Sequence, residues 1–221
     1  MTISRTLLLF DLDGTLLNSE NIILESQRRA FRAIGRPMPD RERALSIVGL
    51  SLGEAFQVLV GPDGPHEEAA EHYRQAFHYL RTHEAHLESL FDGVDALLAT
   101  LIGEPRHVLG IATGKSRRGV DAVKKTYGWE SHFVTTQTSD DAPSKPHPGM
   151  IENACRETGI ASSRTLMIGD SSFDMKMAKA AGVRAIGVSW GFQSVDTLRE
   201  SGADVIVEDF EALASEIARF A

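Results

Sequence analysis

Residues 7–19 read LLLFDLDGTLLNS, and this stretch decides the fold. Its first four residues are apolar without polar alternation, a pattern typical of a short strand that is buried on both faces. The run ends at Asp11 and Asp13, which lie two positions apart and so begin on the same side of the chain. Gly14 and Thr15 then mark a turn. The stretch therefore predicts a buried strand with two carboxylates at its carboxyl end.

Similar apolar runs recur along the chain, and each ends at polar or glycine residues. They occupy residues 108–113, 133–136, 166–169, 185–189 and 205–207. Helical patterns alternate with these runs, at residues 119–127, 149–158, 173–181, 195–201 and 210–220. Regular alternation of strands and helices implies right-handed crossovers and a parallel sheet. The sequence thus predicts an α/β fold with a doubly wound, Rossmann-like parallel sheet.

Residues 17–89 break this alternation, because they have helical periodicity and no clear strand. Apolar residues at 23, 30, 31 and 34 are spaced like one buried face of a helix. Residues 45–60 and 67–86 predict further helices, separated by the turn GPDGP at 61–65. Within the first of them, GLSLG at 49–53 has the character of a flexible turn. We therefore expect a helical cap at 17–89, inserted into an α/β catalytic core made of residues 1–16 and 90–221.

Composition limits the classes of partner and the compartment. The chain has 221 residues and a formal net charge of −8, which argues against nucleic acid and against an anionic membrane surface as partners. A single cysteine, Cys155, excludes an intrachain disulfide and fits a reducing compartment. No stretch approaches the roughly 18 apolar residues of a membrane span. We expect a cytoplasmic protein that is a monomer or a weak homodimer.

In a sheet of this kind, ligands bind at the carboxyl ends of the strands. FDLDGT ends the first strand, IATGKS and MIGDSSFD end two others, and SKPHP precedes the helix predicted from residue 149. Each motif taken alone has an ordinary explanation, such as a turn or a helix cap. Four motifs with complementary chemistry in one sheet favour a shared site.

The acidic residues of these motifs predict a metal site. Asp170 would end a strand, and Asp174 would lie one turn into the following helix. Together with Asp11 and Asp13 they offer only oxygen ligands, and clustered carboxylates repel one another unless a cation neutralises them. Oxygen ligands favour Mg²⁺. For Asp174 the alternative is that it simply caps its helix.

The remaining residues of the motifs predict a phosphate site. Thr113 ends a strand, and Gly114 after it offers a bare backbone amide. Lys145 lies near a helix N-terminus, where its charge opposes the macrodipole and requires an anionic partner; an exposed lysine is the alternative. Backbone amides that can face the same anion are predicted at Leu12, Gly14 and Thr15. A solvated helix start is predicted for Lys115, Arg117 and Arg118, with a basic rim at the pocket as the alternative.

The order DLDGT, a threonine after a buried strand, a lysine and then GDSSFD resembles the haloacid dehalogenase superfamily of phosphohydrolases. The resemblance includes four motifs of that family and spans nearly the whole chain. The helical insert is similar to the small helical (C1-type) cap of the family. FDLDGTLLNS and APSKPHPGM look like the phosphoglycolate phosphatase-like members.

The resemblance implies a role for each motif residue. Asp11 would attack phosphorus and form an aspartyl-phosphate, and Asp13 would protonate the leaving oxygen and then activate water. Thr113 and Lys145 would hold the phosphoryl oxygens. The Mg²⁺ ligands would be Asp11, Asp170 and the carbonyl of Asp13, with Asp174 supporting Asp170 or reaching the metal through water.

We therefore predict a Mg²⁺-dependent phosphatase that acts on a small phosphorylated metabolite, phosphoglycolate-like or a sugar phosphate. The acid at Asp13 disfavours a dehalogenase, since the dehalogenases of this superfamily lack an acid there. A phosphomutase or an inorganic pyrophosphatase on the same scaffold is an alternative. A non-enzymatic phosphorylation sensor is an alternative of another class, against which the cap argues because it would obstruct a partner.

Overall fold

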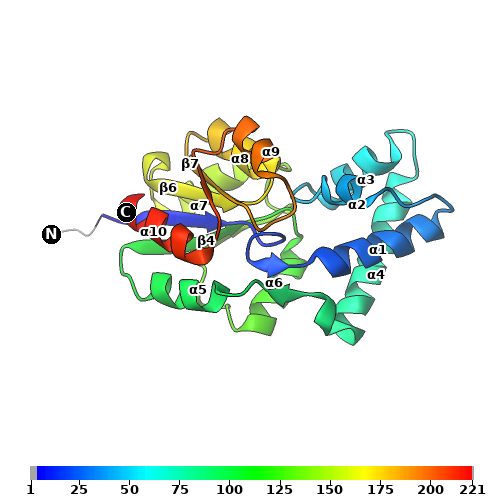
Figure 1. Cartoon of the computed structure of the whole chain (residues 1–221), viewed down its shortest axis with the longest axis horizontal. Coiled ribbons are helices and arrows are strands. Elements are labelled where there is room, and N and C mark those ends of the chain that lie inside the picture. The colour runs from blue at the N-terminus through cyan, green and yellow to red at the C-terminus, as the bar shows by residue number, and fades with distance from the viewer. Residues whose placement is uncertain (1–3, 221) are drawn as a thin grey trace.

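A computed structural model describes residues 4–220, and within them six parallel strands form one sheet in the order β5-β4-β1-β6-β7-β8 (Figure 1). The strands are β1 Thr6–Phe10, β4 His107–Ala112, β5 Thr135–Gln137, β6 Thr165–Gly169, β7 Arg184–Val188 and β8 Val205–Val207. β1 lies between β4 and β6, with Leu8 opposite Leu109 and Leu166. The predicted doubly wound parallel sheet is confirmed.

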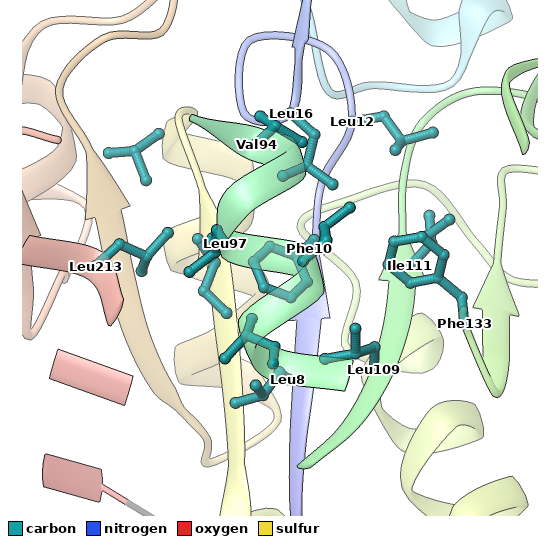
Figure 2. Packing of buried hydrophobic residues seen from close by; sticks show 14 of the residues in the cluster. Leu8, Phe10, Leu12, Leu16, Val94, Leu97, Leu109, Ile111, Phe133 and Leu213 are labelled. Atoms are coloured by element: carbon teal, nitrogen blue, oxygen red, sulfur yellow. The ribbon is translucent and has the colours of Figure 1, made fainter. Parts of the chain in front are cut away.

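The apolar run of β1 is continuous because both faces of the sheet are covered. Leu7 and Leu9 pack against α7 Gly149–Thr158, α8 Ser172–Ala180 and α9 Val195–Glu200. Leu8 and Phe10 face the other layer, made of α5 Val94–Ile102, α6 Arg117–Tyr127 and α10 Phe210–Phe220 (Figure 2). Burial of these side chains removes apolar surface from water and stabilises the three-layer core.

Four helices lie between β1 and the rest of the sheet in the sequence. They are α1 Glu20–Ala33, α2 Arg41–Leu45, α3 Leu52–Val60 and α4 His66–His83, and a 3-10 turn at Ala85–Leu87 follows them. They gather at the end of the molecule opposite α10 (Figure 1). The short strands β2 Leu17–Asn18 and β3 Ser89–Leu90 pair antiparallel where the chain enters and leaves this region. The division into a core and a cap domain with the predicted boundaries stays a prediction.

The prediction of a helix over 45–60 is wrong for residues 46–51. Gly49 there has φ +106°, which a helix does not allow. The helical pattern resumes at Leu52, after Ser51 at the N-cap. The missed element in the core is α5, although Val94, Leu97, Leu98 and Leu101 are buried at helical spacing. Of the helices in residues 4–220, none combines the length and the apolar character that a bilayer crossing requires.

Candidate active site

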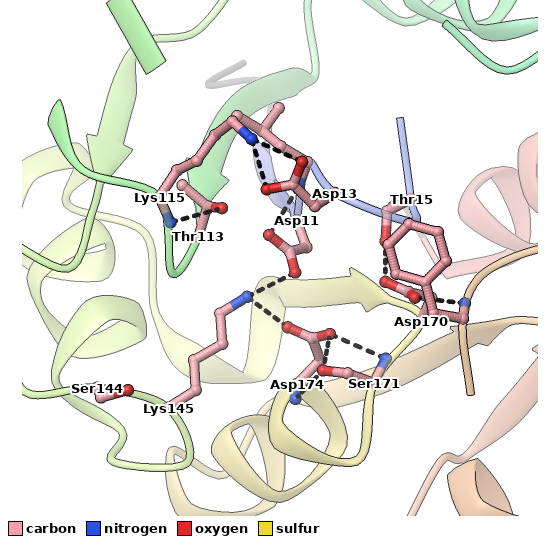
Figure 3. A network of polar contacts seen from close by, with 12 residues as sticks. Asp11, Asp13, Thr15, Thr113, Lys115, Ser144, Lys145, Asp170, Ser171 and Asp174 are labelled. Atoms are coloured by element: carbon pink, nitrogen blue, oxygen red, sulfur yellow. Dashed lines mark hydrogen bonds and ion pairs between the residues drawn. The ribbon is translucent and has the colours of Figure 1, made fainter. Parts of the chain in front are cut away.

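The carboxyl ends of three neighbouring strands bring the predicted site residues together (Figure 3). Asp11 follows β1, Thr113 follows β4 and Asp170 follows β6. Asp174 joins them from the first turn of α8, and Lys145 from the loop before α7. All five are buried. The sheet therefore assembles one site from positions that lie far apart in the sequence.

Lys145 is the buried cation of this site. Its Nζ lies 3.0 Å from Oδ2 of Asp11 and 2.6 Å from Oδ1 of Asp174, and the residue has no exposed surface. Burial alone would lower the pKa of Lys145, but the attraction of Asp11 and Asp174 outweighs burial and raises it. Lys145 is thus a fixed positive charge and not an exposed lysine.

The carboxylates around Lys145 carry more negative charge than one ammonium neutralises. Oxygen atoms of Asp11, Asp170 and Asp174 lie within 4.8 Å of one another. Burial, with the neighbouring charges of Asp174 and Asp13, raises the pKa of Asp11 to about 6 although Lys145 lowers it. Burial, followed by the neighbouring charges of Asp174 and Asp11, raises the pKa of Asp170 well above its usual range. Three buried oxygen donors with uncompensated charge fit a hard divalent cation such as Mg²⁺.

Asp170 is held rigidly between two segments. Its Oδ1 accepts a hydrogen bond from Thr15 Oγ1 at 3.1 Å, and its Oδ2 accepts one from the backbone N–H of Phe192 at 2.8 Å. Gly14 lies directly against this carboxylate, so a Cβ there would fall 2.2 Å from Oδ2. Gly14 also has φ +82°, a conformation that side chains rarely adopt. Glycine is therefore required for the turn to approach the acid.

Asp174 caps its helix and also belongs to the acidic cluster. Its Oδ2 accepts hydrogen bonds from the backbone N–H and the hydroxyl of Ser171, which completes a capping box at the start of α8. Its Oδ1 faces Lys145. The cap and the acidic cluster are thus built from the same side chain, and its predicted role toward the metal stays a prediction.

Asp13 lies beside the cluster and has partners of its own. Its two carboxylate oxygens lie 2.6 and 2.7 Å from Nζ of Lys115 (Figure 3). Ser19 Oγ donates to Oδ1 of Asp13 at 2.7 Å. The prediction of a solvated Lys115 is wrong, since only 11% of its side chain is exposed. Its ammonium also lies 4.9 Å from the ring centre of Phe77 and 3.9 Å from Glu88. Lys115 thus ties Asp13 to the helical region.

The backbone amides predicted to bind phosphate have partners in this structure. The N–H of Gly14 donates to the carbonyl of Leu17, and that of Thr15 to the carbonyl of Leu12. The N–H of Leu12 donates to Oδ1 of Asp11. Gly14 and Thr15 therefore shape the turn and support Asp170, and the phosphate role of Leu12, Gly14, Thr15 and Gly114 stays a prediction.

A cavity of about 430 Å³ lies over Asp11, Asp13 and Thr113, between the strand ends and α1, α3 and α4. The segment before α3 is joined to the loop before α7 by a hydrogen bond, in which the backbone N–H of Ser51 donates to Ser144 Oγ at 2.8 Å. Sequence reasoning missed this serine, although it precedes Lys145. The structure thus places residues of the helical region over Asp11 and Asp13.

Gly114, on the strand-end side of the cavity, lies very close to the backbone of Gly49 and Leu50 on the other side. A Cβ at this position would lie 2.5 Å from the carbonyl oxygens of both Gly49 and Leu50. We predict that Gly114→Ala displaces residues 49–50 and lowers kcat/KM for phosphate esters about tenfold or more, because small misplacements in a closed site are costly. Thermal unfolding should change little. Gly103→Ala, with ordinary contacts at 3.5 Å outside the site, is the matched control.

Comparisons with known proteins identify the family of this chain. The profile of the family described as haloacid dehalogenase-like hydrolase matches residues 8–188. The probable phosphatase IndB of Dickeya dadantii is 35% identical over 210 residues, which cover 93% of this chain and 90% of that protein. A 5'-nucleotidase of Pseudomonas aeruginosa is 32% identical over 208 residues, which cover 93% of this chain and 92% of that protein.

A solved structure shares the whole architecture. The hydrolase from Pseudomonas syringae superposes with a TM-score of 0.86 at 26% identity, covering 98% of this chain and 100% of that one. The segment that matches the family profile, residues 8–188, contains Asp11, Lys145 and Asp174. This chain belongs to the family of haloacid dehalogenase-like hydrolases.

Proposed function

We propose that this protein is a Mg²⁺-dependent phosphatase that hydrolyses a small phosphorylated metabolite through an aspartyl-phosphate on Asp11. The observation that carries the proposal is the buried meeting of Lys145 with Asp11 and Asp174, with oxygens of Asp11, Asp170 and Asp174 within 4.8 Å. This cluster needs a cation, and a phosphoryl group beside Lys145 would bring the charge that the lysine is placed to receive.

The donor set indicates which residues would hold the metal. Asp11, Asp170 and the carbonyl of Asp13 would be ligands, with Asp174 supporting Asp170 or acting through water. Mg²⁺ would neutralise the carboxylates and polarise the phosphoryl group. The Thr15 hydroxyl and the Phe192 amide keep Asp170 oriented for this task.

The first step transfers the phosphoryl group to the protein. A carboxylate oxygen of Asp11 attacks phosphorus in line and forms a P–O bond, while the bond from phosphorus to the leaving oxygen breaks. Asp13 gives its proton to the leaving oxygen. Lys145 and Thr113 hold the other phosphoryl oxygens and stabilise the charge that develops on them.

The second step returns Asp11 to its starting state. Asp13, now a carboxylate, accepts a proton from a water molecule as that water attacks phosphorus. The bond between phosphorus and Asp11 breaks, and inorganic phosphate leaves. Asp13 recovers the proton it gave up, and Ser19 and Lys115 orient it in the resting structure.

Two further observations support a phosphatase over a phosphorylation sensor. The names of the two relatives, a probable phosphatase and a 5'-nucleotidase, support hydrolysis of a phosphate ester. Asp11 is 1% exposed and lies under residues of α1, α3 and α4. A partner protein therefore could not reach it, as signalling by a phosphorylation sensor would require.

A phosphoglycolate-like or sugar phosphate substrate is the expectation from the motifs. A mutase would differ by passing the phosphoryl group to a second substrate instead of water.

Removal of the metal tests the proposal directly. We expect hydrolysis of p-nitrophenyl phosphate with Mg²⁺, a loss of at least about 100-fold with EDTA, and recovery when Mg²⁺ is added back. The measurement is p-nitrophenol release at a fixed enzyme concentration. Turnover that persists unchanged in EDTA after exhaustive dialysis would contradict the metal role, and no turnover with Mg²⁺ would contradict the phosphatase.

A further inference from the structure

Glu88 is a buried acid that the proposed reaction leaves unused. It lies between the 3-10 turn at Ala85–Leu87 and β3, and only 7% of its side chain is exposed. Its Oε2 is buried and has no hydrogen-bond partner among residues 4–220. A buried carboxylate oxygen without a donor costs the folded state free energy. An arrangement in which Glu88 gains a donor would therefore be favoured.

Lys115 is a cation that Glu88 shares with another acid. Its Nζ lies 3.9 Å from Oε2 of Glu88, but 2.6 and 2.7 Å from the two oxygens of Asp13. Burial, with the charge of Asp13, raises the pKa of Glu88, although the charges of Lys115 and Arg81 lower it. Two carboxylates thus compete for one ammonium, and Asp13 holds it in this structure.

A short movement of the Lys115 ammonium would pass it from one acid to the other. A hydrogen bond to Glu88 requires Nζ to approach by about 1 Å, since charge-assisted bonds of this kind are about 2.8 Å long. The Phe77 ring centre lies 4.9 Å from Nζ, so the ring can stay in contact with the ammonium during the movement. Arg81, which also lies near Phe77, donates to the carbonyl of Gly119 at 3.4 Å. Lys115 is therefore the cation with two acids in reach.

The proposed reaction requires Asp13 to release Lys115. Both oxygens of Asp13 accept hydrogen bonds from Lys115, and Ser19 Oγ donates to Oδ1 as well. A carboxyl oxygen that acts on a leaving group must come within about 2.6–3.2 Å of it, and it then turns away from Lys115. Ser19 follows β2 and Glu88 precedes β3, so both lie at the same end of this antiparallel pair. The second partner for Lys115 thus lies next to the first.

We propose that Glu88 is a positioning residue for the general acid, which takes the ammonium of Lys115 when Asp13 turns toward the leaving group. This inference rests on the proposed function, in which Asp13 protonates the leaving oxygen. Lys115 keeps all of its protons, and only its hydrogen-bond partner changes. Among the described residues, the lining of the cavity includes Lys115 but not Glu88, so Glu88 acts through Lys115.

Two substrates of similar shape test this role. Phenyl phosphate and p-nitrophenyl phosphate share a ring, but phenolate is far more basic than p-nitrophenolate and depends more on protonation by Asp13. Hydrolysis of the aspartyl-phosphate is common to both. Glu88→Gln keeps the size of the side chain and removes its charge, so Lys115 should stay on Asp13. We expect the ratio of kcat/KM for phenyl phosphate to that for p-nitrophenyl phosphate to fall about tenfold, measured with Mg²⁺.

The ratio separates positioning from a structural defect. A merely structural role of Glu88 would lower kcat/KM for both substrates alike. Glu208→Gln, on an exposed residue outside the cavity, should leave the ratio unchanged. An unchanged ratio in a folded Glu88→Gln protein would overturn the inference and leave the phosphatase standing. Without turnover of p-nitrophenyl phosphate by the wild-type protein, the proposed function itself fails.

A double variant tests whether Glu88 acts through Lys115. In a Lys115→Met background the ammonium is absent, so Glu88→Gln should change the ratio by less than about twofold. A tenfold fall in that background as well would show that Glu88 acts without Lys115, and would overturn the inference.

A structure of the wild-type protein does not depend on any variant. We expect crystals grown with Mg²⁺ and tetrafluoroaluminate, which stands in for the transferring phosphoryl group, to show Lys115 Nζ within hydrogen-bond distance of Glu88 and no longer bonded to both oxygens of Asp13. Lys115 still bonded to both oxygens of Asp13 in that complex would overturn the exchange.

Discussion

Asp11→Asn is expected to lower the rate of phosphate release at least about 10⁴-fold, because the amide cannot attack phosphorus. The side chain keeps its size, so the contacts of the strand end should persist. Release of inorganic phosphate from p-nitrophenyl phosphate with Mg²⁺ measures the effect. Intact-protein mass spectrometry of a rapidly quenched reaction should detect one added phosphoryl group in the wild-type protein and none in the variant.

The same substitution should not destabilise the protein without metal. Burial raises the pKa of Asp11 from 3.8 to about 6, so its ionised form costs the folded state free energy above pH 6. A neutral asparagine removes this cost, and the unfolding temperature at pH 7 without Mg²⁺ should stay equal or rise. Asp196→Asn, on the exposed side chain of α9, is the control for both measurements. Residual turnover within about tenfold of wild type would rule out Asp11 as the nucleophile.

Lys145→Met is expected to abolish activity and to destabilise the fold as well. The substitution leaves the carboxylates of Asp11, Asp170 and Asp174 buried without their ammonium. Removal of one partner from a buried ionic cluster costs about 3–5 kcal/mol. Without the Lys145 ammonium to stabilise the negative charge on the phosphoryl oxygens, kcat should fall about 10³-fold or more. Thermal unfolding and phosphate release are the two measurements.

Mg²⁺ distinguishes this explanation from a simple loss of packing. If the carboxylates repel one another in the variant, Mg²⁺ should raise its unfolding temperature more than that of the wild type, because the metal then relieves more repulsion. Lys176→Met changes an exposed lysine of the same helix as Asp174 and should leave stability and activity unaltered. A Lys145→Met protein with wild-type stability in EDTA would contradict a charge-balancing role.

The fold could be predicted from the sequence because the patterns that indicate it are local. Continuous burial of β1 and β6 produces apolar runs without alternation, and the acids at their ends stand next to those runs in the sequence. The interruption at residues 46–51 could be predicted only in part, because Gly49 and Gly53 favour a turn but the apolar residues around them also fit a helix. A local sequence pattern indicates whether a segment is buried, but it does not indicate which other segment a loop contacts.

The candidate site likewise consists of residues that the sequence predicted and of contacts that only the structure shows. The sequence alone identified Asp11, Asp13, Asp170 and Lys145, since each follows or precedes a regular element in a recognisable motif. The tertiary structure alone decided that Lys115 pairs with Asp13 across 102 positions, and that Ser51 meets Ser144 across 93 positions. These contacts join the strand ends to the helical insert. They depend on how the sheet and the helical insert pack against each other, and the hydrophobic periodicity within either part does not predict that packing.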